Sequence, residues 1–369
     1  MRDPRIEKLA QVLVKYSASV RKGDVVGIMA QPEALPLVDA IGEAVIREGG
    51  DPVWVPRTTH FAESLLNNAS DEQLARVHPV HLHYIESVDV HFSIMAEANT
   101  KALSRYAPSK LALLQQARRP FLSRFMQRAA EGKLRWCGTQ FPTHASAQDA
   151  EMSLAQYADF VYSAGLLHLP DPAAAWAKVH ERQQRLRDYL QTRKTLRFLS
   201  PAFGGHDGTD LTVDVSAATW INCAGKENFP DGEVFAGPTL PPAGLGVDGH
   251  VNYTFPAVYQ GVRLRFKAGR VVDASARKGE DFLLSMLDQD EGARNLGEIA
   301  IGTNYSITQF SKNTLFDEKI GGTFHAAVGA GYPESGNTNQ SALHWDMVCD
   351  MRPGPLSPGG TIEADGEVF

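Results

Sequence analysis

Apolar positions near the start of the chain switch between helical spacing and uninterrupted runs. Residues 6–16 place apolar side chains at intervals of three and four, and the apolar run 24–30 (DVVGIMA) comes next. Helical spacing returns at 33–48, ends at Gly49-Gly50, and is followed by a second apolar run at 52–55 (PVWV). This order predicts a helix, a buried strand, a second helix and a second strand.

The same alternation continues through the next part of the chain. Residues 88–95 (VDVHFSIM) and 134–137 predict strands, and the segment 108–130 between them is helix-like in composition. Strands that alternate with helices form a mainly parallel sheet with the helices on its faces. We therefore expect an α/β domain in the N-terminal half.

The pattern changes in the second half. Residues 147–194 are strongly helical in character, and after Leu196 the sequence breaks into short β-like stretches such as LTVDV, WINCAG, VNYTFP and VRLRF. Gly, Pro and Asp separate these stretches, which predicts mostly antiparallel strands. The expected architecture is an N-terminal α/β domain (1–195) with a mainly parallel sheet, and a C-terminal α+β domain (196–369) of mostly antiparallel strands that carries the metal site inferred below.

One predicted strand, 341–350 (SALHWDMVCD), has two different faces. Alternation along an extended chain gives one apolar face, which consists of Leu343, Trp345, Met347 and Cys349. The other face carries His344 and Asp346 two positions apart. An imidazole and a carboxylate that project together from an anchored strand can bind a cation or perform acid–base chemistry.

Composition limits the class of partner. The 369-residue chain has a formal net charge of -7, and its Lys and Arg residues are scattered, which argues against nucleic-acid and anionic-membrane partners. Its three cysteines lack C-x-x-C spacing, as is typical of a reducing compartment. The N-terminal segment has no continuous apolar run, and no stretch approaches the roughly 20 apolar residues of a membrane span. We expect a cytoplasmic protein with a small partner.

Common catalytic motifs do not occur in the sequence. There is no G-x-x-x-x-G-K-[ST] phosphate loop, no H-E-x-x-H helix, no G-x-S-x-G elbow, and no G-x-G-x-x-G after the first strand. What remains is a set of acidic, imidazole and phenol groups in apolar or Gly-rich stretches of the second half. These candidates are Glu233, Glu298, His325, Tyr332, His344 and Asp346.

Buried carboxylates and imidazoles need partners, because an isolated buried charge costs several kcal/mol. A metal ion is the simplest partner that all of them could share. Mixed oxygen and nitrogen ligands suit Zn²⁺, Co²⁺ or Mn²⁺, with Mg²⁺ as an alternative. A carboxylate-rich set can hold two ions roughly 3.5 to 4 Å apart with a bridging water. We therefore expect two divalent metal ions.

Each of these signals also has a plainer interpretation. His344 and Asp346 could be a histidine with a supporting carboxylate instead of a pair of ligands. Glu298 could be exposed at the start of a strand, and Tyr332-Pro333 could be a turn. The stretch 78–83 (HPVHLH) has more histidines, but no acidic residue follows closely, and we expect a solvated loop there.

Four consecutive motifs of the second half carry a resemblance to a known family. In order, they are NFPDGEVFAGP, GARNLGEIAIGTN, LFDEKIGGTFHAAVGAGYP and SALHWDMVCD. They closely resemble the motifs of the metallo-aminopeptidases typified by aminopeptidase T and aminopeptidase S, a family of thermophilic-type metalloproteases. The N-terminal half is similar to the family as well, in VRKGDVVGIMA and PTHASAQDAEMS among other stretches. The resemblance thus covers nearly the whole chain.

The resemblance implies a cytoplasmic homodimer with two divalent ions that acts on peptides with a free N-terminus. It implies Tyr332 as a polar active-site residue and places the metal ligands at Glu233, Glu298, His325, His344 and Asp346. The chain departs from the family pattern at Asp231-Gly232, where some members have Thr-Glu, and in a short stretch between Tyr332 and His344. Neither departure touches an implied ligand, although the short stretch could alter specificity.

The leading hypothesis is a hydrolase that removes single residues from peptide N-termini. Metal ions would polarise the scissile carbonyl and activate water, and Tyr332 would hydrogen-bond the developing oxyanion. Either Glu298 or another acid such as Glu334 could accept the proton of the water.

Two other hypotheses remain open. The rival is a ring-cleaving dioxygenase for dihydroxypyridines on the same scaffold, because some proteins resembling the family look like mononuclear iron enzymes with two histidines and one carboxylate. Glu298 stands where such an enzyme would want its extra histidine, which favours the hydrolase. A non-enzymatic metal-binding or peptide-binding module is the least favoured, because so many candidate ligands converge.

Overall fold

The described part of the chain divides into two compact units. The computed structural model describes residues 3–202, 207–255, 261–354 and 357–369. The N-terminal unit comprises the chain up to Ala175 together with Gly225–Pro230, and the C-terminal unit comprises Trp176–Ala224 and Asp231–Phe369. The domain boundary expected between residues 195 and 196 remains a prediction.

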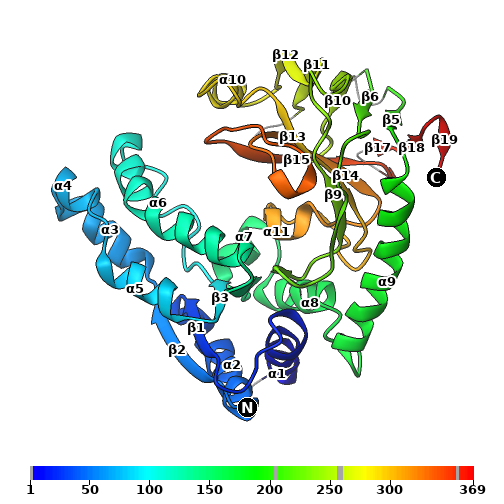
Figure 1. The fold of residues 1–369 in the computed structure, drawn as a ribbon. Coiled ribbons are helices and arrows are strands. Elements are labelled where there is room, and N and C mark those ends of the chain that lie inside the picture. Colours follow the sequence, from blue (N-terminus) through cyan, green and yellow to red (C-terminus); the bar gives the residue numbers. More distant parts are fainter. Residues whose placement is uncertain (1–2, 203–206, 256–260, 355–356) are drawn as a thin grey trace. The chain divides into compact units, whose positions relative to one another are not determined.

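The N-terminal unit is built on a parallel sheet with the order β2-β1-β3-β4-β8. Its strands are β1 (Val25–Ala30), β2 (Asp51–Pro56), β3 (Val90–Met95), β4 (Arg135–Gln140) and β8 (Asn228–Phe229). Every pairing is parallel, so the prediction of a mainly parallel α/β sheet is confirmed. The strands at its centre are almost wholly buried because helices cover both faces (Figure 1).

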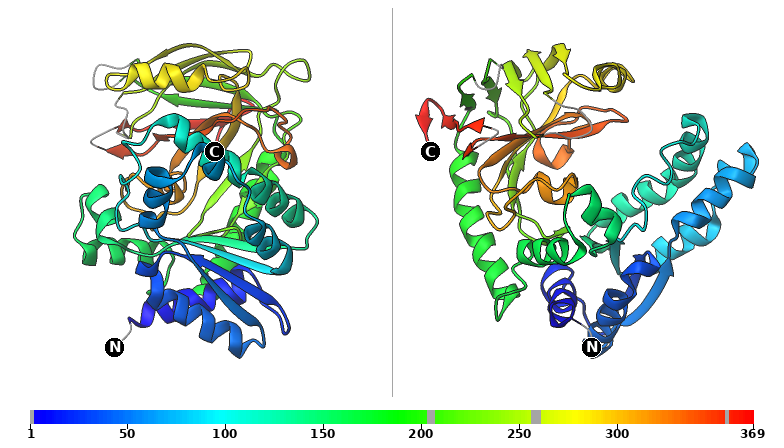
Figure 2. Two further views of the ribbon diagram at one scale, coloured as in Figure 1. Left: turned by 90° about the vertical axis from the view of Figure 1, so that its left-hand side faces the viewer. Right: turned by 180° about the vertical axis from the view of Figure 1, so that it is seen from behind.

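Helices lie on the two faces of this sheet, as two further views also show (Figure 2). On one face, α1 (Pro4–Gln11) continues into a π-helical turn (Val12–Ser17) and packs against α2 (Leu35–Arg47), which follows a short 3₁₀ turn (Pro32–Ala34). On the other face lies α6 (Pro108–Ala130), with the bounds predicted from the sequence. A right-handed crossover places helices on opposite faces when the strand order reverses at β1.

Three helices occupy a segment in which no helix was expected from the sequence pattern. They are α3 (Thr59–Asn68), α4 (Asp71–Leu74) and α5 (Pro79–Ser87). The prediction of a loop at 78–83 is therefore wrong, although the histidines of this stretch are exposed to solvent as expected. His78 forms the N-cap of α5 by accepting a hydrogen bond from the Val80 amide, and Pro79 stands at the first helical position, where its missing N–H costs nothing.

The helical run predicted at 147–194 consists of consecutive helices separated by short turns. These are α7 (His144–Asp149), α8 (Leu154–Ala164) and α9 (Pro172–Gln191). Ser153 begins α8 with a capping box in which its side chain and that of Gln156 each accept a backbone N–H. Among the described residues, no helix combines the length and apolar character that crossing a membrane requires.

The C-terminal unit is built mainly on two large antiparallel sheets, as the short β-like stretches predicted. One sheet has the order β12-β11-β10-β6-β5-β18-β19. Its strands are β5 (Thr195–Ser200), β6 (Thr209–Asp214), β10 (Val247–Asn252), β11 (Arg263–Lys267), β12 (Arg270–Ser275), β18 (Thr361–Ala364) and β19 (Glu367–Val368).

The second sheet of this unit has the order β15-β14-β13-β9-β7. Its strands are β7 (Ile221–Cys223), β9 (Glu233–Ala236), β13 (Leu296–Gly302), β14 (Thr323–Gly329) and β15 (His344–Asp350). The smaller elements of the unit are α10 (Glu280–Leu287), α11 (Thr314–Asp317), a 3₁₀ turn (Pro333–Ser335), β16 (Pro353–Gly354) and β17 (Ser357–Pro358).

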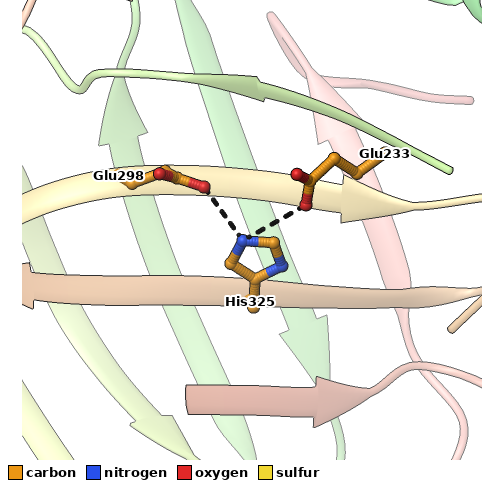
Figure 3. A group of neighbouring side chains, drawn as sticks. All are labelled: Glu233, Glu298 and His325. Carbon is orange, nitrogen blue, oxygen red and sulfur yellow. Dashed lines mark hydrogen bonds and ion pairs between the residues drawn. The ribbon is translucent and has the colours of Figure 1, made fainter. Parts of the chain in front are cut away.

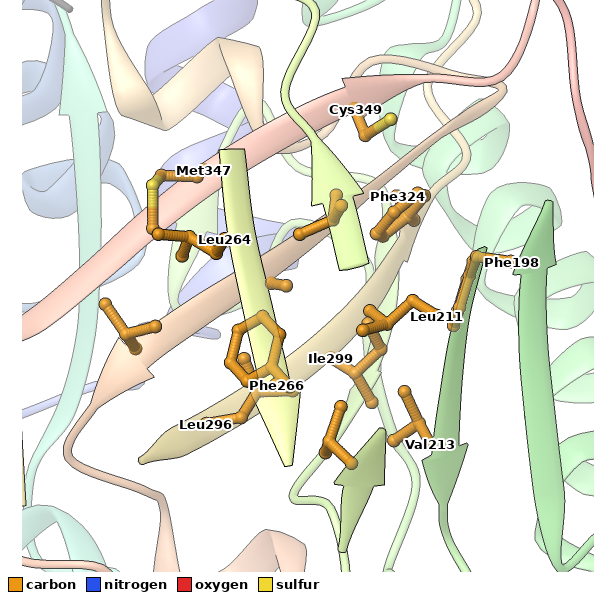
Figure 4. Packing of buried hydrophobic residues seen from close by; sticks show 14 of the residues in the cluster. Phe198, Leu211, Val213, Leu264, Phe266, Leu296, Ile299, Phe324, Met347 and Cys349 are labelled. Carbon is orange, nitrogen blue, oxygen red and sulfur yellow. The ribbon is translucent and has the colours of Figure 1, made fainter. Parts of the chain in front are cut away.

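A single hydrophobic cluster joins the two sheets of the C-terminal unit (Figure 4). Phe198 of β5 and Phe324 of β14 meet in it with ring centroids 4.3 Å apart. Full burial of a Leu or Phe side chain stabilises the folded state by about 1.5–3 kcal/mol, so this cluster is the main source of the unit's stability. Because side chains alternate along strands, the opposite face of the second sheet is free to carry polar groups.

Candidate metal centre

The face of the second sheet that points away from the core carries the predicted site residues. On β14, Phe324 lies in the core cluster, and the next residue, His325, belongs to the opposite face. The same alternation separates Ile299 from Glu298 on β13 and Met347 from Asp346 on β15. The two-faced strand predicted at 341–350 is confirmed in this respect.

The strand register brings side chains from different strands into line. Glu298 pairs with Ala327, and Ala327 pairs with Asp346, so the two carboxylates flank a methyl group in one row across the sheet. A bulge in β13 just before Glu298 shifts its register relative to β14. Ala327 is small and buried, so no large side chain stands between the two carboxylates within this row.

His325 lies at the centre of the site. Its Nε2 atom is 3.0 Å from Glu298 Oε1, 3.6 Å from Glu233 Oε2 and 3.8 Å from Asp346 Oδ1; Figure 3 shows the first two contacts. Its Nδ1 atom lies 3.1 Å from the carbonyl oxygen of Glu318 and donates to it. A hydrogen bond of this kind at one ring nitrogen fixes the ring so that the other nitrogen faces a ligand.

His344 is oriented in the same way. Its Nδ1 atom donates to the Ala330 carbonyl oxygen at 2.9 Å. Its Nε2 atom faces Glu298 Oε2 at 3.6 Å and Asp346 Oδ1 at 3.5 Å. Glu298 therefore directs one oxygen toward each imidazole, and the interpretation of Glu298 as an exposed residue is wrong, since it is only 5% exposed.

The donor atoms form overlapping groups in which all atoms lie within 4.8 Å of one another. Within the described chain, these groups are Glu233, Glu298 and His325; Glu298, His344 and Asp346; and Glu318, His325 and Asp346. The structure thus brings together all the candidate ligands that the sequence singled out. Glu334, the alternative proton acceptor, is exposed on the 3₁₀ turn and belongs to none of the groups.

Three further charged residues in the site, Asp231, Glu318 and Lys319, were not predicted from the sequence. Lys319, 1% exposed, places its Nζ atom 2.5 Å from Glu233 Oε1 and 2.5 Å from Glu318 Oε1. Asp231 Oδ1 lies 3.9 Å from the same Nζ atom. The signal for Glu318 and Lys319 in the sequence is that the run FDEKIGG is flanked by apolar and small residues.

Local backbone constraints fix the start of β9 and with it Glu233. Gly232 has a φ of +126°, and a Cβ atom there would lie 2.7 Å from the Cβ atom of Asn304, so only glycine fits the close approach. Gln183 of α9 is buried, and its Nε2 atom donates to the Glu233 carbonyl oxygen at 2.9 Å. Its Oε1 atom accepts from Thr303 Oγ1 at 2.9 Å.

Tyr332 borders the centre. Its ring lies edge-on to that of His344, with centroids 5.0 Å apart, and edge-on to that of Phe235 at 5.6 Å. Burial, together with the negative charges of Glu298 and Asp346, raises the pKa of its phenol, so Tyr332 keeps its proton and remains a hydrogen-bond donor.

The charges of the cluster explain how its groups titrate. Burial disfavours a positive charge on His325, but the hydrogen bond that its ring donates to Glu298 and the carboxylates of Glu233 and Asp346 outweigh burial and raise its pKa to about 10. In the same way, Asp346 outweighs burial and raises the pKa of His344 to about 9. The negative charge of the carboxylates stabilises the protons on both imidazoles, and the same negative charge would stabilise a divalent cation in place of those protons.

The residues present fit a divalent metal ion. Glu233 Oε2 is buried and has no hydrogen-bond partner among the described residues, which is costly for a carboxylate oxygen unless a cation binds it. Buried carboxylate and imidazole donors within one small volume are the ligand types that Zn²⁺, Co²⁺ and Mn²⁺ prefer. The site therefore defines a candidate metalloprotein centre.

The chain belongs to the thermophilic metalloprotease (M29) family, whose family model matches residues 2–356. Membership makes it a metal-dependent hydrolase and confirms the resemblance drawn from the motifs. Aminopeptidase 2 of Geobacillus stearothermophilus is 26% identical over 359 residues, a match that covers 90% of this chain and 84% of that protein.

Solved structures agree with this fold. Wild-type AmpT from Thermus thermophilus is similar with a TM-score of 0.82 and 24% sequence identity, covering 99% of this chain and 97% of that one. The 2,5-dihydroxypyridine dioxygenase from Pseudomonas putida KT2440 is similar with a TM-score of 0.58 and 12% identity, covering 98% and 94% of the two chains. The predicted combination of an α/β half with an antiparallel C-terminal half is confirmed.

Proposed function

We propose that this protein is an aminopeptidase that hydrolyses the N-terminal residue from peptides and holds its metal ions with Glu233, Glu298, His325, His344 and Asp346. The observation that carries the proposal is the convergence of these side chains from neighbouring strands onto one buried face, with both imidazoles directing Nε2 inward. Family membership and the names of the relatives support peptides as substrates.

We further propose that these residues would hold two metal ions, with Glu298 as a ligand available to both. Two of the donor groups share only this residue, and its two oxygens face different imidazoles. Zn²⁺, Co²⁺ and Mn²⁺ are the preferred identities, and Mg²⁺ stays an alternative.

The chemistry divides between the bound ions and the protein. When bound, divalent ions polarise the scissile carbonyl and lower the pKa of water so that it attacks near neutral pH. Tyr332, protonated and beside His344, donates a hydrogen bond to the developing oxyanion. Glu298 accepts the proton of the water, because it lies among the donors whereas Glu334 is exposed.

Replacing Glu298 by Gln tests the proposal. The amide removes the shared negative ligand, so Glu298→Gln should lose bound metal and reduce turnover of an aminoacyl-nitroanilide together, by about a thousandfold or more for the latter. Metal content is measured by elemental analysis of the folded protein. The control, Glu334→Gln, changes an exposed acid and should keep both. Full activity in Glu298→Gln would contradict the assignment.

The dioxygenase alternative has only a shared fold in its favour. Metal analysis separates the two functions: one iron per chain with substrate-dependent oxygen uptake would support a dioxygenase, and two Zn, Co or Mn ions without oxygen uptake support the peptidase. A failure of every metal and peptide to give turnover would instead revive a non-enzymatic binding module.

The remaining expectations stay predictions. They are a homodimer, a cytoplasmic location, and partners that include neither nucleic acid nor membrane. The charge pattern of the sequence and the resemblance support them. Sedimentation of the purified full chain would measure its oligomeric state directly.

A further inference from the structure

We propose that Lys319 is a positioning residue that occupies Glu233 Oε1 and thereby presents Oε2 alone to a metal ion. The inference rests on the proposed function, because it takes Glu233 to be a ligand. Lys319 itself touches no reacting group and acts only through Glu233. The proposal assigns a purpose to a buried lysine that the catalytic scheme does not otherwise use.

The contacts of Lys319 place its charge between carboxylates. Nζ lies 2.5 Å from Glu233 Oε1, 2.5 Å from Glu318 Oε1 and 3.9 Å from Asp231 Oδ1, and the side chain is almost completely buried. An ammonium group has donors but no acceptor, so each contact directs a hydrogen or a positive charge at an acidic oxygen. The hydrogen bond from Lys319 fixes one oxygen of Glu233. The carboxylate group therefore cannot rotate, and its second oxygen keeps its direction.

The second oxygen of Glu233 is the one that faces the centre. Oε2 has no hydrogen-bond partner among the described side chains and lies 3.6 Å from His325 Nε2. A glutamate with both oxygens free can bind one ion with both of them. With Oε1 held by Lys319, Glu233 can contribute a single oxygen, which lowers the coordination number and keeps a position open for substrate or water.

The segment that carries Lys319 also fixes His325. Residues Glu318 and Lys319 connect α11 to β14, and the backbone there is anchored because the Lys319 carbonyl oxygen accepts from the Asn304 amide at 3.0 Å. The Glu318 carbonyl oxygen accepts from His325 Nδ1. One short connection therefore orients two proposed ligands, Glu233 through a side chain and His325 through a carbonyl group.

The alternative role of Lys319 is charge balance alone, and the two roles predict opposite results. An ammonium near a cation site repels the cation, so removing the charge would by itself strengthen metal binding. If Lys319 instead positions Glu233, its removal should weaken binding, because Glu233 loses its fixed orientation. Loss of an outer partner of a ligand typically weakens metal affinity by roughly 10- to 100-fold.

The experiment measures metal binding to the full chain after chelation. Zn²⁺ and Co²⁺ are titrated by calorimetry into the wild type, Lys319→Met, Glu233→Gln and the double variant, and the visible spectrum of bound Co²⁺ reports the coordination number. We expect Lys319→Met to bind one ion roughly 10- to 100-fold more weakly and to change the Co²⁺ spectrum. The double variant should bind no more weakly than Glu233→Gln.

Controls separate the possible failures. Lys278→Met changes an exposed lysine of the same unit and should bind as the wild type does. If Lys319→Met does not fold, Lys319→Gln keeps a polar atom beside the buried carboxylates and is expected to weaken binding in the same direction. Unchanged or tighter binding in either folded variant overturns the role of Lys319. A wild type without metal, or no effect of Glu233→Gln, overturns the proposed ligands instead.

Discussion

Tyr332 is the residue whose proposed role can be separated from metal binding. It is not one of the proposed ligands, and its ring is half-buried against Phe235 and His344. Its phenol can therefore affect the transition state without affecting how the ions are held. This separation makes it a better probe of the hydrolytic mechanism than any ligand.

We expect Tyr332→Phe to lower kcat by about 10²- to 10³-fold, the usual effect of losing one oxyanion donor, with little change in metal content. Turnover of an aminoacyl-nitroanilide and elemental analysis of the same sample check this. Tyr305→Phe is the matched control, because Tyr305 is 68% exposed. Loss of metal in Tyr332→Phe would show that its role is structural.

At the level of single residues, the sequence predicted the proposed ligands but not what supports them. Glu233, Glu298 and His325 are noticeable because each is a polar group in an apolar stretch. Lys319 follows Asp317 and Glu318 directly, and a run of charges normally indicates a solvated surface. Its burial depends on contacts with β9, which is distant in sequence, and local pattern does not contain such contacts.

At the level of elements, α9 supports the site through hydrogen bonds to the strand that carries Glu233 and to neighbouring strands. Gln183 bonds the backbone of β9 through the Glu233 carbonyl oxygen and the side chain of Thr303, the residue after β13. It also donates to the Cys223 carbonyl oxygen at the end of β7, at 2.8 Å. One amide thus links a helix to several strands next to the proposed ligands.

Gln183→Leu should destabilise the protein by about 1–3 kcal/mol, because it removes the buried hydrogen bonds that the Gln183 amide makes to the Glu233 and Cys223 carbonyl oxygens and to the Thr303 hydroxyl. Thermal unfolding of the chelated full chain measures the change. The same variant should bind metal more weakly, since the start of β9 loses its anchor. Arg185→Leu, at an exposed position of the same helix, should stay within about 0.5 kcal/mol of the wild type.

The elements themselves were largely predictable, and the exceptions have a physical cause. Long segments of helix-like sequence such as 108–130 and alternating strands such as 341–350 carry their own signal. The helices of 59–87 were missed, and so was β8, which spans only Asn228–Phe229. A two-residue strand is specified by the partner edge that it joins, and here that edge belongs to β4, far earlier in the chain.

At the scale of the whole molecule, a buried histidine of the N-terminal unit makes the stability of the protein depend on pH. His91 of β3 is 4% exposed and its Nδ1 atom lies 2.8 Å from the Tyr84 hydroxyl. Burial, with a smaller effect of Arg57, lowers the pKa of His91 to about 4. The unfolded chain therefore binds a proton near pH 6.5 that the folded chain does not bind until about pH 4.

Stability should consequently fall as the pH drops below 6.5, and His91 alone should account for about 2 kcal/mol between pH 7 and pH 5. His91→Gln removes this contribution, so its unfolding midpoint in urea should depend less on pH over that range than the wild-type midpoint. His83→Gln replaces an exposed histidine of α5 and should leave the slope unchanged. An equal slope in His91→Gln would contradict the prediction.

The path of the chain through β8 limits how the protein can be divided into separately folding fragments. The chain leaves the N-terminal unit after Ala175, returns for Gly225–Pro230, and leaves again. A gene cut between Ala175 and Gly225, including the predicted boundary at residue 195, would deprive the first sheet of its edge strand and uncover the backbone of β4. Each half expressed alone would then be prone to aggregate, and co-expression of both fragments would be needed to rebuild the sheet.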